Sequence, residues 1–510
     1  MAQIQIMGVV GAGPMGAGIA QIGLTSGLEV ILYDLNAAAL AQARKDVLAR
    51  IARMVEKGQL PAGSVEDADG RFKLAAEIAD FAPAELVVEA IIERLEPKQA
   101  LFAQLEAVVS DTCILASNTS SLSVAAIAAK CANKTRVCGL HFFNPVPLMK
   151  LVEVVVAPAT SAQVAEDATA FSHLIKKVPV TVKDGPGFLV NLQGRAYTLE
   201  GLAVVQEGVA DPATVDRIMR DAAGFRMGPF ELMDLTGIDV NFAATTFIYE
   251  GYQHDPRLKT TTLHELMFNA GRFGRKTGQG YHDYTPGVEL PKRPEASANP
   301  PKLKVKLAGD SAHWDAFSAL VSREAGDDVT LVAPIGEDCT TVCARLGLDP
   351  KTTVAIDFTA IERKHLTVMS APGGSAAAAK VADWLRSHDL AVEVIADSPG
   401  FVLQRILAMV ANLGCELAQI GVGAPADIDT AMKLAQNYPA GPLEFAEKLG
   451  VANTFAIMDQ LQKITGSDRY AGAAGAYVCL SRCWPDLAIF VFELCVAAGV
   501  SRKFVKATYR

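Results

Sequence analysis

The stretch Ile4-Gln-Ile-Met-Gly-Val-Val-Gly11-Ala-Gly13-Pro-Met-Gly16-Ala-Gly-Ile-Ala joins an apolar run, a GxGxxG turn and the start of a helix. This order is typical of the first βα unit of a dinucleotide-binding fold. Gly11 permits the tight turn, Gly13 lets the backbone approach a pyrophosphate, and Gly16 allows the helix to pack closely on the strand. The N-terminus of the helix offers N–H groups and a positive dipole end to the phosphates.

The next predicted strand, Glu29–Tyr33, ends directly before Asp34. An acid at this place accepts hydrogen bonds from the ribose hydroxyls of adenosine and repels a 2′-phosphate. No arginine follows Asp34 immediately, so the sequence favours NAD over NADP. The alternative is a glycine-rich turn followed by a chance acid, and the rest of the chain has to exclude it.

Polar side chains follow three further apolar runs, 86–92, 113–117 and 136–140. In open α/β sheets, ligands bind outside the carboxyl ends of the strands, so these side chains are predicted to lie at one edge of the sheet. Any one of them could instead cap a helix. They are Glu93, Lys98, Asn118, Ser120, His141 and Asn144.

His141 and Glu153 are associated with two runs of strand composition that a loop with Pro145 and Pro147 separates. We expect the first run, 136–140, to deliver His141 into the loop, and the second run to carry Glu153. If the strands lie side by side, the carboxylate meets the imidazole. It then fixes the tautomer and stabilises the protonated ring, which suits a general acid/base. Taken alone, such a pair is more often structural.

The second half of the chain repeats part of the first at a constant offset of 213 residues. The motif 184–188, DGPGF, recurs as DSPGF at 397–401, and GPFE at 228–231 recurs as GPLE at 441–444. Turn residues at matched places indicate one helical unit present twice. The segment before the second copy has no GxGxxG, and it offers Val368-Met-Ser-Ala-Pro372 where the pattern would call for His141. Gln404 stands at the position of Asn191.

The predicted fold is therefore an α/β Rossmann-like dinucleotide-binding domain followed by an all-α domain, which is duplicated with a degenerate α/β segment between the copies. That segment should have no active site of its own. The tail is rich in Ala and Gly and then in Cys, and we assign it no function. The predicted parts are 1–183 (NAD-binding), 184–284 (first helical copy), 285–301 (proline-rich linker), 302–396 (degenerate α/β segment), 397–470 (second helical copy) and 471–510 (atypical tail).

Composition excludes several classes of protein. The formal net charge of −9 and the pI near 5.5 argue against nucleic acid and anionic membrane surfaces as partners. No apolar stretch is long enough for a membrane span, and the N-terminus does not resemble a signal peptide. The nine cysteines form no CxxC pair, so we expect no metal site and a reduced, cytoplasmic protein.

The chain resembles the 3-hydroxyacyl-CoA dehydrogenases, most closely the long bacterial form with a duplicated C-terminal domain that is associated with phenylacetate degradation. The resemblance covers residues 4 to about 470. It implies reversible, NAD-dependent oxidation of an L-3-hydroxyacyl-CoA to a 3-oxoacyl-CoA. The implied substrate is 3-hydroxyadipyl-CoA or 3-hydroxybutyryl-CoA. The motifs that carry it are GAGPMGAGIA, VVEAIIERLEPKQALF, SNTSSLS, HFFNPVPLMKLVEVV, DGPGFLVN and GRKTGQGYHDY.

The same resemblance implies roles for individual residues. His141 would be the catalytic base and Glu153 its orienting partner. Ser120 and Asn191 would hydrogen-bond the substrate oxygen and the surroundings of the histidine. Beyond the three glycines of the turn, the implied dinucleotide-binding positions are Asp34, Glu93, Lys98, Asn118, Asn144 and Lys276.

Two other functions share this fold. One is a non-catalytic, dinucleotide-sensing binding protein, and the other is a hydroxyacid dehydrogenase with a catalytic lysine. Neither explains why His141, Glu153, Ser120 and Asn191 occur together. For assembly, we expect either a homodimer or an intrachain pseudo-dimer in which the two helical copies pack together and cover the surface that single-copy relatives would use to dimerise.

Overall fold

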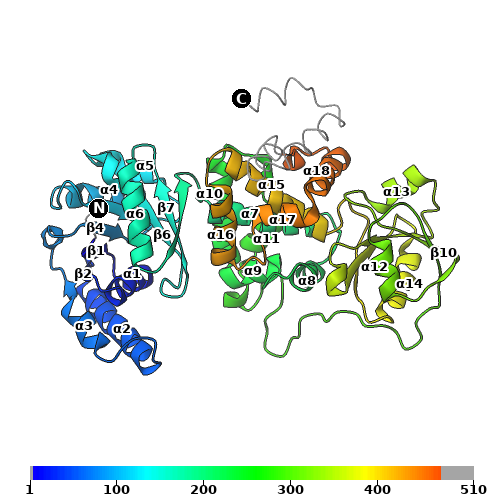
Figure 1. The fold of residues 1–510 in the computed structure, drawn as a ribbon, viewed down its shortest axis with the longest axis horizontal. Coiled ribbons are helices and arrows are strands. Elements are labelled where there is room, and N and C mark those ends of the chain that lie inside the picture. Colours follow the sequence, from blue (N-terminus) through cyan, green and yellow to red (C-terminus); the bar gives the residue numbers. More distant parts are fainter. Residues whose placement is uncertain (1–3, 473–510) are drawn as a thin grey trace, which may run out of the picture. The chain divides into compact units, whose positions relative to one another are not determined.

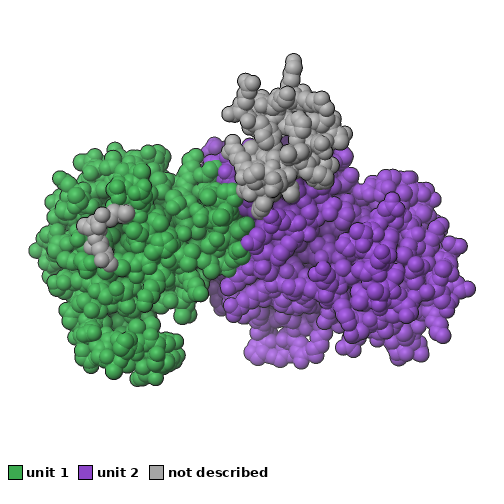
Figure 2. Space-filling view, in the orientation of Figure 1, with its two compact units in different colours: residues 1–190, 421–436 green, residues 191–420, 437–510 purple. Residues whose placement is uncertain are grey.

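The computed structural model describes residues 4–472, so all of the predicted tail beyond its first two residues lies outside the described part. The chain divides into two compact units. Unit 1 comprises residues 1–190 and 421–436, and unit 2 comprises residues 191–420 and 437–510 (Figure 2). These units group elements by contact, and the domain borders predicted from the sequence remain predictions.

Unit 1 is built on an eight-stranded sheet of order β3-β2-β1-β4-β5-β6-β7-β8 (Figure 1). All neighbouring strands are parallel except β6 and β7, which are antiparallel. The elements are β1 (Ile6–Val10), α1 (Pro14–Thr25), β2 (Glu29–Tyr33), α2 (Ala37–Glu56), α3 (Ser64–Gly70), β3 (Phe72–Leu74), β4 (Leu86–Glu89), α4 (Leu95–Glu106), β5 (Ile114–Ser117), α5 (Val124–Ile127), β6 (Val137–Phe142), β7 (Leu151–Val156), α6 (Ala162–Leu174), β8 (Val178–Lys183) and α16 (Pro425–Gln436).

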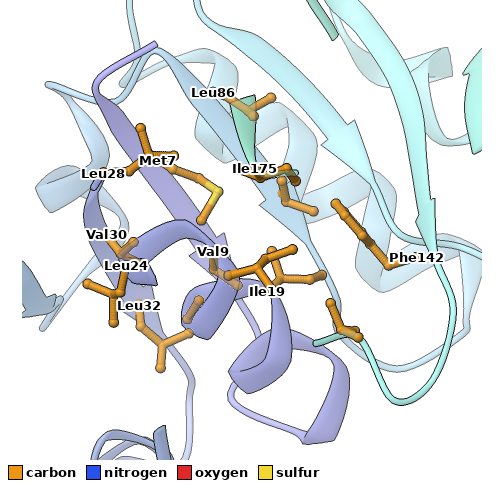
Figure 3. Close-up of a cluster of buried hydrophobic side chains, with 14 of the residues drawn as sticks. Met7, Val9, Ile19, Leu24, Leu28, Val30, Leu32, Leu86, Phe142 and Ile175 are labelled. Atoms are coloured by element: carbon orange, nitrogen blue, oxygen red, sulfur yellow. The ribbon is translucent and has the colours of Figure 1, made fainter. Parts of the chain in front are cut away.

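Buried apolar side chains of the central strands and of α1 form the core of this unit. Met7 and Val9 of β1 are fully buried and pack in one cluster with Ile19 of α1, Val30 of β2 and Phe142 of β6 (Figure 3). Strands buried on both faces read as continuous apolar runs, which is why the sequence predicts them well.

Two predicted boundaries are wrong. The run 86–92 forms a strand only as far as Glu89, because Ile91 N–H donates to the Glu89 carboxylate and turns the chain. His141 lies inside β6 and not in the following loop, because the pairing with β7 continues to Phe142 opposite Val152.

Helix α16 belongs to the second helical copy by sequence, yet it lies in unit 1. It follows a segment that joins β8: Lys183 N–H donates to Val422 O (2.9 Å), and Val182 forms an isolated antiparallel bridge with Gly423. The same bond recurs 213 residues later with the roles of the copies exchanged, since Ala396 N–H donates to Val209 O (2.9 Å). Each helical copy therefore contributes a segment to the α/β part of the other half.

The helices of unit 2 come from both copies, and the copies pack on each other. Gln193 Nε2 donates to Val410 O (2.9 Å), and the ring of Phe225 stacks on Phe445 at 5.6 Å. The first copy forms α7 (Val190–Gln206, whose first residue is in unit 1), α8 (Pro212–Arg217), the π-helix η4 (Ile218–Ala222), α9 (Pro229–Thr236), α10 (Ile238–Gly251) and α11 (Thr262–Asn269). The second copy forms α15 (Leu403–Gln419), α17 (Pro442–Leu449) and α18 (Val451–Thr465).

Backbone conformation repeats with the sequence. Phe188 and Phe401 both have a positive φ (48° and 52°), as do Lys176 and Asp389 (59° and 60°). Left-handed conformations are unusual for such residues, so their recurrence at the offset of 213 supports one structural unit present twice.

The segment between the copies folds as the predicted α/β segment. Its sheet, in the order β9-β10-β11-β12-β13, repeats the relative strand directions of β4 to β8, with one antiparallel pair at the same place. It contains no counterpart of β1 to β3. The elements are β9 (Lys304–Leu307), α12 (Trp314–Leu320), β10 (Glu324–Val332), α13 (Cys339–Leu346), β11 (Thr353–Asp357), β12 (His365–Met369), α14 (Ser375–Arg386) and β13 (Ala391–Val394).

The register of this sheet corrects the predicted counterpart of His141. In unit 1, His141 pairs with Glu153 across β6 and β7, and in the second sheet Asp357 pairs with Thr367 across β11 and β12. Asp357 thus occupies the position of His141, whereas Val368-Met-Ser-Ala-Pro372 belongs to the following strand. The predicted position was therefore one strand too late, since Val368 and Met369 lie in β12 and Asp357 is the last residue of β11.

A buried ionic network joins the two helical copies within unit 2. Arg405 of α15 is fully buried; it donates to Glu200 of α7 and to Glu207 (2.6 Å). Arg469 donates to the other Glu200 oxygen (2.9 Å), and Tyr470 OH donates to the first (3.0 Å). Removing Arg405 leaves the fully buried Glu200 with one ion-pair partner among the described residues, Arg469, where it had two, and it breaks the ion pair that links Glu207 to the network.

We therefore expect Arg405→Ala to lower the free energy of unfolding by roughly 3–5 kcal/mol, measured by urea denaturation. The matched control is Arg345→Ala, which removes a surface pair with Glu337 (2.7 Å) and should cost no more than about 1 kcal/mol. Equal losses in the two variants would contradict the assignment of a buried network.

Candidate active site

His141 and Glu153 form a buried pair on adjacent antiparallel strands. Nδ1 of His141 lies 2.6 Å from Oε2 of Glu153, and the two residues are 6% and 0% exposed. The other carboxylate oxygen, Oε1, accepts hydrogen bonds from the backbone N–H groups of Leu189 (3.0 Å) and Val190 (2.9 Å). A carboxylate held by two amides cannot rotate away, so it fixes the imidazole ring and its tautomer.

Aromatic rings flank the imidazole. The ring centroids of Phe143 and Phe188 lie 4.5 Å and 5.8 Å from that of His141. Because Nδ1 is engaged with Glu153, Nε2 is the ring atom left for proton transfer. A histidine with this geometry can act as a general base or acid.

Glu93 organises the loop that carries Ser120. Its Oε1 accepts from Thr119 Oγ1 (2.6 Å), from Ser120 N–H (2.9 Å) and from Ser121 N–H (3.1 Å). Burial raises the pKa of Glu93, but the hydrogen bonds from Thr119 and Ser120 and the charge of Lys98 outweigh it and lower the pKa to about 2. Glu93 is therefore an anion at neutral pH, and it orders the residues after β5.

Lys98 links Glu93 to a second, deeper carboxylate. Its Nζ lies 2.6 Å from Glu89 Oε1 and 3.1 Å from Glu93 Oε2, and the lysine is only 1% exposed. Glu89 also accepts from Ser117 Oγ at the end of β5 (2.6 Å). The sequence pointed to Lys98 but missed Glu89; an acid inside the apolar run 86–92 was the available signal.

The glycine loop fits a dinucleotide. A Cβ at Gly16 would stand 1.8 Å from Gly11 O, so only glycine lets α1 pack on the turn, and Gly11 has a φ of 111°. At Gly13 nothing lies within 4 Å of a Cβ position, which leaves room for an approaching pyrophosphate. Asp34 accepts the N–H of Ala12 (2.7 Å), so the acid that suits the ribose also braces the loop.

The remaining predicted residues are placed as follows. Asn118 accepts from Phe142 N–H (2.8 Å) and joins the ends of β5 and β6, and Asn144 is exposed in the loop after β6. Asn191 is the second residue of α7 and Lys276 pairs with Asp239 (2.5 Å); both are in unit 2. Within unit 1, direct contacts join His141 with Glu153, and Glu93 with Ser120 and Lys98. The roles of the predicted site residues stay predictions.

One further residue shapes the loop after His141. Lys177, 7% exposed, donates its ammonium to Val146 O (2.5 Å) and Met149 O (2.6 Å), and burial lowers its pKa to about 8. No motif in the sequence identified it, since its role depends on two backbone carbonyls nearly thirty residues away.

The corresponding positions of the second sheet have different chemistry. Asp357 is fully buried, accepts from Gln404 Nε2 (3.0 Å) and Thr359 Oγ1 (2.6 Å), and has a pKa that burial raises. Gln404 is the counterpart of Asn191. No histidine pairs with a carboxylate there, and among residues 4–472 no group of His, Cys, Asp and Glu is arranged to hold a metal ion.

Two family models match the sheet of unit 1 and both helical copies. The family model of the 3-hydroxyacyl-CoA dehydrogenase NAD binding domain matches residues 6–185, and that of the 3-hydroxyacyl-CoA dehydrogenase C-terminal domain matches residues 187–284 and 400–477. The two stretches of the second match lie in the two helical copies. Within the described residues, no helix is long and apolar enough to cross a membrane.

Similar proteins cover either all or half of the chain. The 3-hydroxyadipyl-CoA dehydrogenase of Escherichia coli (strain K12) is 38% identical over 477 residues, which span 92% of this chain and 96% of the relative. A probable 3-hydroxybutyryl-CoA dehydrogenase of Deinococcus radiodurans is 37% identical over 54% of this chain and 99% of its own. The crystal structure of 3-hydroxybutyryl-CoA dehydrogenase from Escherichia coli K12 has a TM-score of 0.85 at 36% identity, covering 96% of this chain and 100% of the other.

The hydrogen bonds of Glu93 predict a local effect on dynamics. Glu93→Ala should accelerate amide hydrogen exchange at Ser120 and Ser121 by about tenfold or more, because each amide loses a bond to a charged acceptor. The matched control is Glu106→Ala, whose carboxylate accepts from the amides of Ala132 (2.6 Å) and Asn133 (2.8 Å). It should accelerate exchange there and not at Ser120. Unchanged protection of Ser120 in Glu93→Ala would show that the loop does not depend on this carboxylate.

Proposed function

The chain belongs to the 3-hydroxyacyl-CoA dehydrogenase family, and from that membership we propose which of its residues carry the reaction. It is an NAD-dependent oxidoreductase that converts a 3-hydroxyacyl-CoA to a 3-oxoacyl-CoA. The observation that supports our residue assignment is the buried contact of 2.6 Å between His141 and Glu153. A non-catalytic dinucleotide sensor is not favoured, since it has no use for such a pair.

His141 acts as the general base in the direction of oxidation. Its Nε2 takes the proton of the substrate 3-hydroxyl group, and NAD, when bound, would supply the acceptor for the hydride that leaves C3. The imidazolium that forms is stabilised by the carboxylate of Glu153, which the amides of Leu189 and Val190 hold in place. In the reverse direction the same imidazolium donates the proton, so one residue serves both directions.

Ser120 and Asn191 position the substrate oxygen. The Ser120 loop is ordered by Glu93, so its hydroxyl group is held at the carboxyl end of β5, close in strand order to His141. Asn191 directly follows Val190, whose backbone amide donates to Glu153. The backbone just before Asn191 is therefore fixed by the catalytic pair.

Unit 1 would hold NAD. The turn with Gly11, Gly13 and Gly16 would receive the pyrophosphate, and Asp34 would receive the adenosine ribose. Glu93, Lys98, Asn118 and Asn144 complete the proposed set of dinucleotide-binding positions in unit 1, and Lys276 of unit 2 stays a prediction from the resemblance. For Lys98 the support is indirect, because its buried ammonium acts on the carboxylates of Glu93 and Glu89.

The names of the relatives suggest two substrates, 3-hydroxyadipyl-CoA and 3-hydroxybutyryl-CoA. Relatives that cover the whole duplicated chain carry both names: the 3-hydroxyadipyl-CoA dehydrogenase matches 92% of this chain and the solved 3-hydroxybutyryl-CoA dehydrogenase 96%. We propose 3-hydroxyadipyl-CoA as the substrate, on the name of the full-length relative with the higher identity, 38% against 36%. NADH oxidation with acetoacetyl-CoA, longer 3-oxoacyl-CoAs and 3-oxoadipyl-CoA separates the two. A higher kcat/KM for acetoacetyl-CoA than for 3-oxoadipyl-CoA would contradict this choice.

The proposal extends to assembly and location. The packing of α7 on α15, with Gln193 and Arg405 bonded across the copies, supports an intrachain pseudo-dimer in place of a homodimer. The six cysteines among the described residues are all buried, which supports a reducing, cytoplasmic environment.

His141→Gln should lower kcat by about a hundredfold or more, the usual scale for the loss of a general base, while NADH binding is largely kept. Steady-state kinetics with acetoacetyl-CoA and NADH fluorescence titration measure the two effects. The matched control is Asp357→Asn, at the corresponding position of the second sheet, which should leave kcat unchanged because that position takes no part in catalysis. Near-normal turnover by His141→Gln would rule out the proposed base.

Asp34→Ala should raise KM for NADH and relax the exclusion of NADPH, because the carboxylate no longer binds the ribose hydroxyls or repels a 2′-phosphate. The ratio of kcat/KM for the two cofactors measures this selectivity. An unchanged ratio would count against the ribose assignment.

A further inference from the structure

The predicted linker 285–301 is tied to unit 2 at two points. Arg217 donates from Nη1 to Pro291 O (3.1 Å) and is itself held by Glu393 (2.7 Å and 3.0 Å). Six residues later, Ser297 donates its N–H and hydroxyl group to the two oxygens of Asp383 (2.7 Å and 2.6 Å). Residues 292–296 are therefore a strap with both ends fixed, and not a free tether.

This strap forms one wall of a cavity of about 580 Å³. The opposite wall consists of residues just before β12 and β13, at the edge of the sheet where β11 ends. By strand order, this edge corresponds to the edge of the first sheet at which β6 carries His141. A volume of this size lies within the range of small-molecule sites. The lining residues are Lys292, Arg293, Pro294, Glu295, Ala296, Arg363, Lys364, Arg386, Asp389, Leu390 and Ala391.

The lining is strongly cationic in a chain whose net charge is −9. Five of the lining side chains are basic and two are acidic. Only two of the basic groups have a carboxylate within 4 Å in the described part of the chain: Lys292 pairs with Glu289 (2.8 Å) and Lys364 with Asp389 (3.8 Å). Arg293, Arg363 and Arg386 therefore form no ion pair with any described carboxylate, although Glu393 and Asp383 act on Arg386 at longer range.

Two of the arginines are seated against the backbone. Arg386 donates from Nη2 to Val392 O (2.8 Å). Arg363 lies over Gly224, where a Cβ would stand 2.6 Å from its Nη2. Gly224 has a φ of 83°, and the counterpart of this glycine in the second helical copy is Asn437. Glycine thus leaves the space that the guanidinium group of Arg363 occupies.

We propose that this cavity binds a polyphosphate anion. Converging cations repel one another, and an anion with three or more charges offsets the excess of basic over acidic groups. Guanidinium groups donate paired hydrogen bonds to phosphate oxygens, which makes phosphate a better match than a single carboxylate. No aromatic ring lines the cavity, so recognition falls on the phosphate chain and not on a stacked base. The site depends on the strap, which exists only because two halves are joined in one chain.

The test is calorimetric titration of the full chain, saturated with NAD so that the dinucleotide site is filled, with sodium tripolyphosphate. We expect one site per chain, and binding that weakens as salt rises. Arg363→Gln should weaken binding about tenfold or more, as the loss of a paired arginine–phosphate contact predicts. The matched control, Arg323→Gln, removes the same charge from an exposed arginine of unit 2 that does not line the cavity and should bind as the unaltered chain does.

Parallel titrations with ATP and with free coenzyme A distinguish the sources of the phosphate groups. Equal binding of tripolyphosphate and ATP, weakened alike by Arg363→Gln, identifies the phosphate chain as the recognised part. Tighter binding of coenzyme A, with the same sensitivity to Arg363→Gln, assigns the cavity to the phosphate groups of that carrier. No binding of tripolyphosphate to the unaltered chain, or binding that Arg363→Gln leaves unchanged, would overturn the proposal. Dehydrogenase turnover and the thermal midpoint verify that each variant is folded.

Discussion

Glu153 is the residue on which the geometry of the site depends. One of its oxygens meets Nδ1 of His141, and the other accepts the amides of Leu189 and Val190 at the point where the sheet ends and α7 begins. A fully buried carboxylate without these partners would be costly to keep charged. These hydrogen bonds compensate the burial of Glu153. They also fix the imidazole of His141 and the backbone at the start of α7, so the fold and the catalytic geometry depend on the same carboxylate.

Local patterns were enough to predict the first sheet. The apolar runs of β1, β2 and β5, the glycine turn and Asp34 can all be read from adjacent residues, because strands buried on both faces and a phosphate-binding turn need specific neighbours. The contact between His141 and Glu153 was also predicted, since antiparallel neighbours joined by a short loop meet directly. Glu89 and Lys177 were not, because their partners are a buried lysine and two carbonyls that only the tertiary structure brings near.

The duplication was evident from the sequence, but its consequences in space were not. A constant offset of 213 residues identifies the repeated turns, yet it does not say that the segment before α16 joins β8 or that Val209 receives the amide of Ala396. Each bond links parts of the two halves that are far apart in sequence. The counterpart of His141 was missed for a related reason: Asp357 follows from strand register, and register is decided by pairing across β11 and β12.

The two sheets then differ in what lies at their equivalent edges. In the first, β6 carries His141, which a carboxylate holds; in the second, Asp357 accepts from Gln404 and Thr359 through Oδ1, and its buried Oδ2 has no hydrogen-bond partner among the described residues. In the described part of the chain, Asp357 is hydrogen-bonded to no imidazole, so it has no general base to orient. This sheet also has no counterparts of β1 and β2, the strands on either side of the glycine turn and α1. The second half therefore keeps the packing of a dehydrogenase half while losing the groups for hydride transfer. At its equivalent edge, Arg363, Lys364 and Arg386 line the cavity beside the strap.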